Sequence, residues 1–219
     1  MIAIVLLDLG DVVARWDPSP RLAEYARRSG LTVDEVRRRL AQDDFWVDTD
    51  RGVYSGDEMY AQICARLGVA FTRDELLALQ ALAFRPQPEV LRIAEQLAAR
   101  LRVGILTNNA PLLREAVSRH FPELERIFAP ILYSFEFGHA KPARELFDAV
   151  ARALALVPRQ IFFADDQASH VAGARAAGWD AVRFESAAQL RVALVERGLV
   201  ARAPAHADPA GDVQKEPST

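Results

Sequence analysis

The polar side chains best suited to chemistry in this chain stand in four short groups: Asp8; Thr107 with Asn108; Lys141; and Asp165 with Asp166. Three carboxylates brought together would repel one another and raise one another's pKa unless a cation offset their charge. Oxygen ligands with positions left open for water suit Mg²⁺. An ammonium, a hydroxyl and an amide beside them could hold the oxygens of an anion. These residue types predict phosphoryl transfer through an aspartyl-phosphate.

Three of the groups directly follow apolar runs that are typical of strands buried on both faces. The runs cover residues 2–7, 103–106 and 161–164. Lys141 precedes Pro142 at the start of a helix that follows a further strand, expected over 131–134. Because parallel strands end at one edge of a sheet, where open α/β sheets bind ligands, we expect the four groups to converge there. Taken alone, Asp8 would be interpreted as the cap of a turn, and only the other groups make it a candidate nucleophile.

From Pro88 onward, strands and helices alternate. Helices are expected over 90–101, 111–120, 143–156 and 171–177, a short fifth strand over 180–184, and a last helix that opens at Ser186. This alternation implies right-handed crossovers. It predicts an α/β fold: a Rossmann-like parallel sheet with helices on both faces.

The segment from about Pro18 to Phe84 has a helical pattern with no strand signal. Three capping boxes mark helix starts, and two glycines mark helix ends: Thr32 with Glu35, Ser55 with Glu58, Thr72 with Glu75, Gly30 and Gly68. A bundle of about four helices inserted after the first strand fits this pattern. We therefore expect an α/β core from residues 1–14 and 87–200, a helical cap over 15–86, and a disordered tail over 201–219 that is rich in Ala, Pro and polar groups.

The amino-acid composition indicates which binding partners and which cellular compartment to expect. Of the 219 residues, 51% are hydrophobic and 26% charged, the net charge is -3 and the pI is near 5.9, so neither nucleic acid nor an anionic membrane is expected as a partner. The lone cysteine, Cys64, fits a reducing compartment. The first apolar run lacks a basic leader and is cut short by Asp8, and no run reaches membrane-spanning length. We expect a cytoplasmic protein, either a monomer or a homodimer.

The four groups, in this order, resemble the four motifs of the haloacid dehalogenase-like hydrolase superfamily, over roughly residues 1–197. The insert resembles the four-helix cap of the subgroup that includes phosphoglycolate phosphatase, β-phosphoglucomutase and the N-terminal phosphatase domain of epoxide hydrolase. The resemblance implies that Asp8 is the nucleophile, with Lys141 as the second catalytic residue. It also implies that Thr107, Asn108 and Lys141 bind the phosphoryl group. Mg²⁺ would be held by Asp8, the carbonyl of Gly10 and Asp166, with Asp165 assisting.

The chain departs from the family at two positions. Most phosphatases of the family read Asp-x-Asp, and the second Asp is the general acid and base; here that residue is Gly10. Asp11 comes one residue later, and strand alternation predicts that its side chain points the other way. Loss of acid–base assistance, worth about 10²–10⁴ in rate, would leave a slow enzyme. His170 stands where Asn or Asp is more usual; we favour a hydrogen-bonded structural histidine, with orientation of Lys141 or of the metal shell as the alternative.

The cap is expected to face the site. Arg15, Trp16, Phe45 and Trp46 could line an apolar or sugar-binding wall, although core packing is the favoured interpretation for Phe45 and Trp46. No motif accompanies His120, His139 or Asp57, and we expect them to be surface or capping residues.

The combined prediction is a Mg²⁺-dependent phosphomonoester hydrolase that acts on a small phosphorylated metabolite, with sugar phosphates as one candidate class. The first alternative is a 2-haloacid dehalogenase, which uses the same aspartate on carbon without a metal. The pair Asp165–Asp166 disfavours it, because uncompensated acid would repel a carboxylate substrate. The second alternative is a non-catalytic relative that binds a phosphorylated ligand or a protein, which Gly10 makes plausible.

Overall fold

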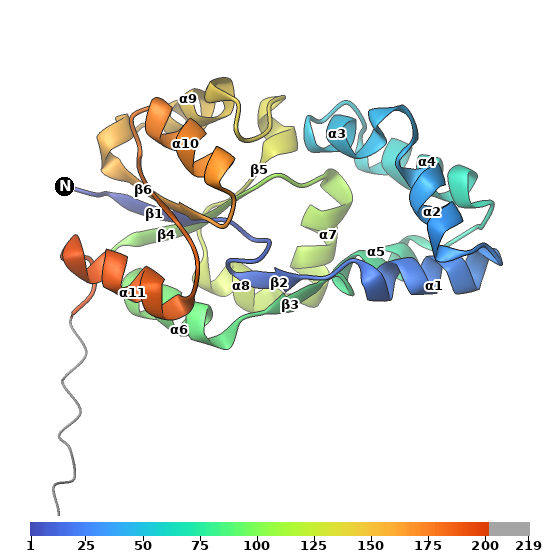
Figure 1. Ribbon diagram of the computed structural model, residues 1–219, viewed down its shortest axis with the longest axis horizontal. Helices are drawn as coiled ribbons and strands as arrows, with labels where there is room; N and C mark the ends of the chain where they lie inside the picture. Colours follow the sequence, from blue (N-terminus) through green and yellow to red (C-terminus); the bar gives the residue numbers. More distant parts are fainter. Residues whose placement is uncertain (202–219) are drawn as a thin grey trace, which may run out of the picture.

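The centre of the structure is a five-stranded parallel sheet (Figure 1). This computed structural model describes residues 1–201, so the tail expected over 201–219 lies, except for Ala201, outside the described residues. The strands are β1 (Ile4–Leu7), β4 (Arg102–Thr107), β5 (Ile131–Tyr133), β6 (Ile161–Asp165) and β7 (Asp180–Arg183), in the order β5-β4-β1-β6-β7. All neighbouring strands run parallel. The predicted α/β class is confirmed.

β1 occupies the middle of the sheet and is buried on both faces. Val5 and Leu7 belong to one hydrophobic cluster, whereas Ile4 and Leu6 belong to another, because alternate side chains of a strand point to opposite faces. Leu7 pairs with Ile105 of β4 on one side and with Ala164 of β6 on the other. The carboxyl ends of three strands are therefore aligned, and the residues that follow them meet.

Helices cover both faces of the sheet (Figure 1). One face carries α6 (Pro88–Ala98), α7 (Pro111–His120), α8 (Pro122–Ile127) and α11 (Ala187–Glu196), and the other carries α9 (Arg144–Ala153) and α10 (Ala168–Ala176). The predicted helices are present with shifts of a few residues at their ends. Helix α8 was not predicted, although Pro122 at its first turn is a known signal for a helix start.

The helical insert comprises α1 (Ser19–Ser29), α2 (Val33–Leu40), the 3₁₀ turn η1 (Gln42–Asp44), α3 (Phe45–Asp50), α4 (Gly56–Leu67) and α5 (Arg73–Ala81). Complete capping boxes form at Ser55 and Thr72. At Thr32 only half of the predicted box is present, because the Glu35 carboxylate is bound by Arg38 and Arg39 instead. Gly30 and Gly68 end α1 and α4 in the left-handed conformation that favours glycine.

Two short strands that the sequence did not reveal join the insert to the sheet domain. β2 (Ala14–Trp16) and β3 (Phe84–Pro86) form an antiparallel pair, so the chain enters and leaves the insert side by side. Each strand has three residues, which is too few for an alternating pattern to be recognised. The insert also packs directly on the sheet domain, since α4 and α5 contact α7.

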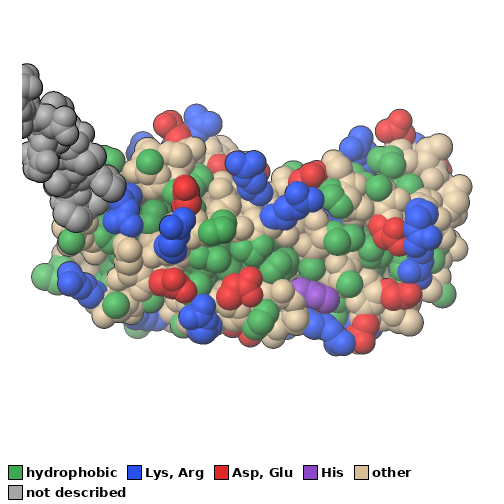
Figure 2. Space-filling model, turned by 90° about the horizontal axis from the view of Figure 1, so that it is seen from below, with side chains coloured by type: hydrophobic (Ala, Val, Ile, Leu, Met, Phe, Trp, Pro, Cys, Tyr) green, Lys and Arg blue, Asp and Glu red, His purple; other side chains and the backbone are tan. Residues whose placement is uncertain are grey.

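Charged side chains of both signs are interspersed on the face shown in Figure 2. Among residues 1–201, no helix is long and apolar enough to cross a membrane.

Candidate active site

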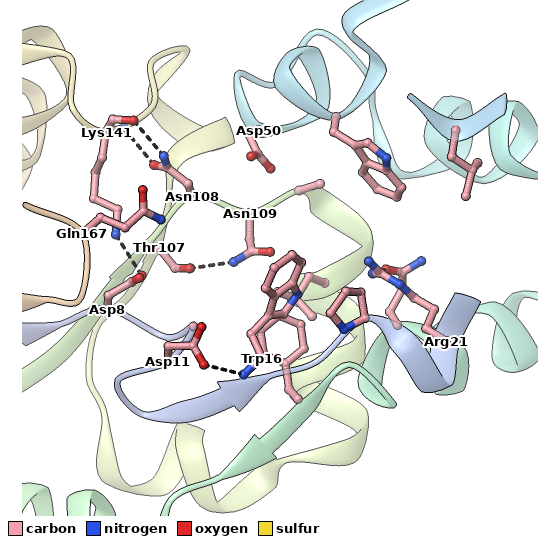
Figure 3. Close-up of a pocket in the computed structure, with 18 of the residues that line it drawn as sticks. Asp8, Asp11, Trp16, Arg21, Asp50, Thr107, Asn108, Asn109, Lys141 and Gln167 are labelled. Atoms are coloured by element: carbon pink, nitrogen blue, oxygen red, sulfur yellow. Dashed lines mark hydrogen bonds and ion pairs between the residues drawn. The ribbon is translucent and has the colours of Figure 1, made fainter. Parts of the chain in front are cut away.

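The predicted site residues converge at the carboxyl edge of the sheet, on the floor of a cavity of about 630 Å³. Asp8 follows β1, Thr107 ends β4 and Asp165 ends β6, and all three are buried. Lys141 reaches the same place from the loop between η2 (Ser134–Phe137) and α9. The opposite wall of the cavity comes from the helical insert (Figure 3).

The Lys141 ammonium lies between two carboxylates. Its Nζ is 2.8 Å from Oδ1 of Asp8 and 2.6 Å from Oδ2 of Asp165, and it donates a hydrogen bond of 3.1 Å to the carbonyl of Leu106. Burial alone would lower the pKa of Lys141, but the two carboxylates outweigh that effect and raise it. The lysine is therefore a fixed positive charge beside the candidate nucleophile.

The backbone around Lys141 is held by Asn108 and by close packing against α10. Asn108 Oδ1 accepts from the Lys141 N–H at 2.8 Å, and Asn108 Nδ2 donates to the Lys141 carbonyl at 2.9 Å. A Cβ at Gly173 of α10 would lie 2.5 Å from the carbonyl oxygen of Pro142, so only glycine allows this approach. The side chain of Asn108 therefore positions Lys141. Its predicted contact with the phosphoryl group stays a prediction.

Asp165 has both carboxylate oxygens engaged. Oδ1 accepts from the Gln167 N–H at 2.8 Å, Oδ2 contacts Lys141, and Nδ1 of His170 lies 3.0 and 3.1 Å from the two oxygens. Burial would raise the pKa of Asp165, but the hydrogen bond with His170 and the charge of Lys141 outweigh it and lower the pKa. Both interpretations of His170 hold in part, since it is a buried, hydrogen-bonded histidine and it contacts the carboxylate that orients Lys141.

The carboxylates of Asp8, Asp165 and Asp166 offer oxygens within 4.8 Å of one another. Burial raises the pKa of Asp8, and Lys141 offsets this only in part. Burial and the nearby charges of Asp165 and Asp11 raise the pKa of Asp166. The residues thus leave negative charge uncompensated, and their hard oxygen donors fit Mg²⁺. Because the oxygens of Asp165 are engaged, Asp8 and Asp166 are the better ligands, with the backbone of Gly10 at the same cavity.

The turn after β1 corrects the expectation for Asp11. The strand ends at Leu7, and Asp11 has a φ of 54°, so the alternation that would point its side chain away does not apply. Its N–H donates to the Ala14 carbonyl at 2.7 Å, and its Oδ1 accepts from the Trp16 N–H at 3.1 Å. The carboxylate of Asp11 therefore fixes the turn that leads into β2.

A second hydrogen-bonded network links the catalytic edge to the insert, and the sequence did not reveal it. Asn109 Nδ2 donates to Thr107 Oγ1 at 2.6 Å, and the Asn109 N–H donates to Ser134 Oγ at 3.2 Å. Ser134 Oγ in turn donates to the backbone carbonyl of Asp50, in the insert, at 2.6 Å. The position of Asn109 beside Thr107 and Asn108 was the one signal available, since nothing in the sequence places Asp50 here.

The insert contributes aromatic and basic side chains to the cavity. Trp16 and Trp46 line the cavity, whereas Arg15 is not among the lining residues. Phe45 is fully buried in the core, which agrees with the core packing expected for it. The Arg21 guanidinium lies 5.5 Å from the centre of the Trp46 ring and donates to Gln80 Oε1 at 2.7 Å. The cavity is thus polar and acidic at the sheet and aromatic and basic at the insert.

Comparison with known proteins places this geometry in a family. A model of the haloacid dehalogenase-like hydrolases matches residues 2–178. The chain belongs to the haloacid dehalogenase-like hydrolase family. A phosphatase of Mycobacterium tuberculosis is 30% identical to this hydrolase over 204 residues, which cover 89% of this chain and 92% of the relative. A D-ribitol-5-phosphate phosphatase of Bacteroides thetaiotaomicron is 24% identical, over 87% of this chain and 96% of its own.

Solved structures of the haloacid dehalogenase-like family share the fold. A family enzyme of Bacteroides thetaiotaomicron, solved with magnesium and inorganic phosphate, superposes with a TM-score of 0.74 at 20% identity and covers 84% of this chain and 95% of its own. The L-2-haloacid dehalogenase of Xanthobacter autotrophicus superposes with a TM-score of 0.59 at 20% identity, over 92% and 85% of the two chains. The fold is therefore common to both enzyme alternatives, and the site has to distinguish them.

Proposed function

We propose that this haloacid dehalogenase-like hydrolase is a Mg²⁺-dependent phosphomonoester hydrolase that works through an aspartyl-phosphate on Asp8. The observation that carries the proposal is the cluster of three carboxylates at the floor of the cavity, two of which contact the buried Lys141 ammonium. Such a site has negative charge for a metal ion and a fixed cation for the phosphoryl group that the metal accompanies. The two relatives named as phosphatases support the same conclusion.

In the first step, an oxygen of the Asp8 carboxylate attacks phosphorus and the bond from phosphorus to the leaving oxygen breaks. Lys141 and the Thr107 hydroxyl stabilise the charge on the transferring oxygens. A bound Mg²⁺ would supply further neutralisation of that charge, held by Asp8, Asp166 and the Gly10 carbonyl. Water then attacks the aspartyl-phosphate, which releases inorganic phosphate and restores the Asp8 carboxylate.

The acidic cluster also disfavours the dehalogenase alternative. A 2-haloacid carries a carboxylate, which would lie against Asp8, Asp165 and Asp166 with Lys141 already shared by two of them. A phosphate ester brings a divalent cation with it and so relieves the same repulsion.

The cavity supports a small polar metabolite as the substrate. Its volume of about 630 Å³ falls within the range of small-molecule sites. Trp16, Trp46 and Arg21 at the insert end can stack on a ring or hydrogen-bond to hydroxyls, which suits a sugar or polyol phosphate. The relative named as a D-ribitol-5-phosphate phosphatase supports that class.

The direct test is turnover of 4-nitrophenyl phosphate by the purified protein with Mg²⁺ and after chelation. We expect turnover with Mg²⁺, none after chelation, and none by Asp8→Asn, whose amide fills the same volume without being a nucleophile. Wild-type turnover by Asp8→Asn would refute the proposal. Metal-independent release of halide from a 2-haloacid would establish the dehalogenase alternative instead.

A further inference from the structure

The proposed hydrolysis needs a proton donor for the leaving alcohol, and the residue two positions after the nucleophile does not provide one. Gly10 has no side chain. The carboxylate of Asp11 holds the turn through the Trp16 N–H, and Nδ1 of His170 lies against Asp165. The two other titratable groups beside the nucleophile are thus partly committed, which favours a donor from another wall of the cavity.

Asp50 stands on the opposite wall. It is the last residue of α3 and lines the cavity together with Asp8, Thr107 and Lys141. Figure 3 shows its carboxylate, carried by the insert, pointing toward the space near Asn108 and Asn109. Among residues 1–201, no hydrogen bond or ion pair engages this carboxylate, so it faces the cavity uncommitted.

The backbone that carries Asp50 is fastened to the sheet domain. Ser134 Oγ donates to the Asp50 carbonyl at 2.6 Å, and the same hydroxyl accepts from the Asn109 N–H. Two residues later, Gly52 has a φ of 76°, and a Cβ there would collide with the carbonyl oxygen of Phe135. Both contacts reach η2, so the end of α3 is fixed relative to the catalytic edge although it belongs to the insert.

The surroundings of Asp50 suit proton transfer near neutral pH. Burial raises the pKa of Asp50 to about 7, although the charge of Lys141 acts in the opposite direction. The acidic groups on the neighbouring elements η1 and η2 are not among the causes of this pKa shift. Asp43 Oδ2 lies 3.7 Å from a guanidinium nitrogen of Arg66, Asp44 is exposed, and Glu136 Oε1 lies 3.2 Å from a guanidinium nitrogen of Arg114. A carboxyl group whose pKa lies near the working pH is well matched to donate and accept a proton.

We propose that Asp50 is the general acid and base of this enzyme, supplied to the reaction by the helical insert. The inference rests on the proposed phosphatase function. As the bond from phosphorus to the leaving oxygen breaks, its electron pair goes to that oxygen, which takes the proton of the Asp50 carboxyl. The alcohol departs and leaves Asp50 as a carboxylate. That carboxylate accepts a proton from the water that attacks the aspartyl-phosphate, and the enzyme returns to its starting state.

The test compares two phosphate esters, of which only one needs its leaving group to be protonated. The alkoxide of glycerol 3-phosphate needs protonation to leave, whereas nitrophenolate leaves readily without it. We expect Asp50→Asn to lower kcat/KM for glycerol 3-phosphate by about 10²-fold or more. The kcat/KM for 4-nitrophenyl phosphate should change by less than about threefold, because it reports the steps up to release of nitrophenolate and not the later hydrolysis of the aspartyl-phosphate that both esters share. This near-constant value also shows that the variant is folded. The matched control is Asp48→Asn, which removes the same charge from the same helix away from the cavity lining and should leave both rates unchanged.

A pH profile gives a second measure. In the wild type, kcat/KM for the alkyl ester should fall as the pH rises through about 7 and Asp50 loses its proton; in Asp50→Asn this limb should be missing. Equal losses of kcat/KM on both esters, or a limb that persists in the variant, would overturn the assignment of Asp50 while the phosphatase function stands. Failure of the wild type to hydrolyse either ester would overturn the proposed function, and the role of Asp50 with it.

Discussion

Replacing Lys141 with Met tests whether the site depends on one buried cation held between two carboxylates. The side chain of Lys141 is fully buried, that of Asp165 is fully buried and that of Asp8 nearly so. Removing the ammonium leaves the two carboxylates close together without the cation between them. Loss of one member of a buried charge cluster costs about 3–5 kcal/mol of unfolding free energy. We expect a loss of this size at pH 7.5 by urea unfolding, together with loss of phosphatase turnover.

The sign of the pH dependence follows from the same geometry. Without Lys141, the pKa of Asp165 rises from below the unfolded value of about 3.9, and the pKa of Asp8, which is already raised by burial, rises further. The folded variant then binds more protons than the unfolded chain between neutral pH and about pH 4, so its deficit relative to the wild type should shrink as the pH falls. The matched control is Arg144→Met, which removes an exposed cation from an i,i+4 pair and should cost less than about 0.5 kcal/mol. A loss below 1 kcal/mol for Lys141→Met, or a deficit that does not depend on pH, would refute the reasoning.

Three further outcomes follow from the site. In an Asp50→Asn background, Gly10→Asp should raise alkyl ester turnover by up to about 10²-fold, because a Cβ at Gly10 meets only Trp16 Cβ at 3.8 Å; unchanged rates would show that a carboxylate at this position cannot reach the leaving group. Asp166→Ala should raise the Mg²⁺ concentration required for half-maximal turnover, and an unaltered metal titration would remove Asp166 from the ligand set. Gly173→Ala should destabilise the fold by about 1–3 kcal/mol and lower turnover, since its Cβ must displace Pro142 beside Lys141; wild-type melting and turnover would contradict the proposed packing.

Local pattern was sufficient for the frame of the site. Asp8, Thr107 and Asp165 each follow an apolar run, and such a run predicts a buried strand whatever the rest of the chain does. Once the strands are parallel, their carboxyl ends must share an edge, so convergence of these residues is a consequence of topology. The helix starts at Ser55 and Thr72 were predictable for a similar reason, because a capping box satisfies backbone donors within a few residues of itself.

The conformation of the turn after β1 was decided by tertiary structure. Asp11 adopts a positive φ, which its residue type permits but does not predict. The hydrogen bond that its carboxylate accepts from the Trp16 N–H depends on the pairing of β2 with β3. That pairing joins residues from opposite ends of the insert, and each strand is too short to carry a pattern of its own. The alternation rule failed here because the chain had already left the strand.

The division of labour among the polar side chains was also decided by packing. Sequence placed Asn108 at the right edge, but whether its amide faces a substrate or the backbone of Lys141 depends on where the loop before Pro142 lies. Asp50 belongs to the insert, and it reaches the cavity only because Ser134 and the close approach at Gly52 fasten α3 to η2. Sequence alone determined which residues follow the strands, because strand formation is local. Tertiary structure determined which residue faces the nucleophile from across the cavity, because that depends on how the insert packs on the sheet domain.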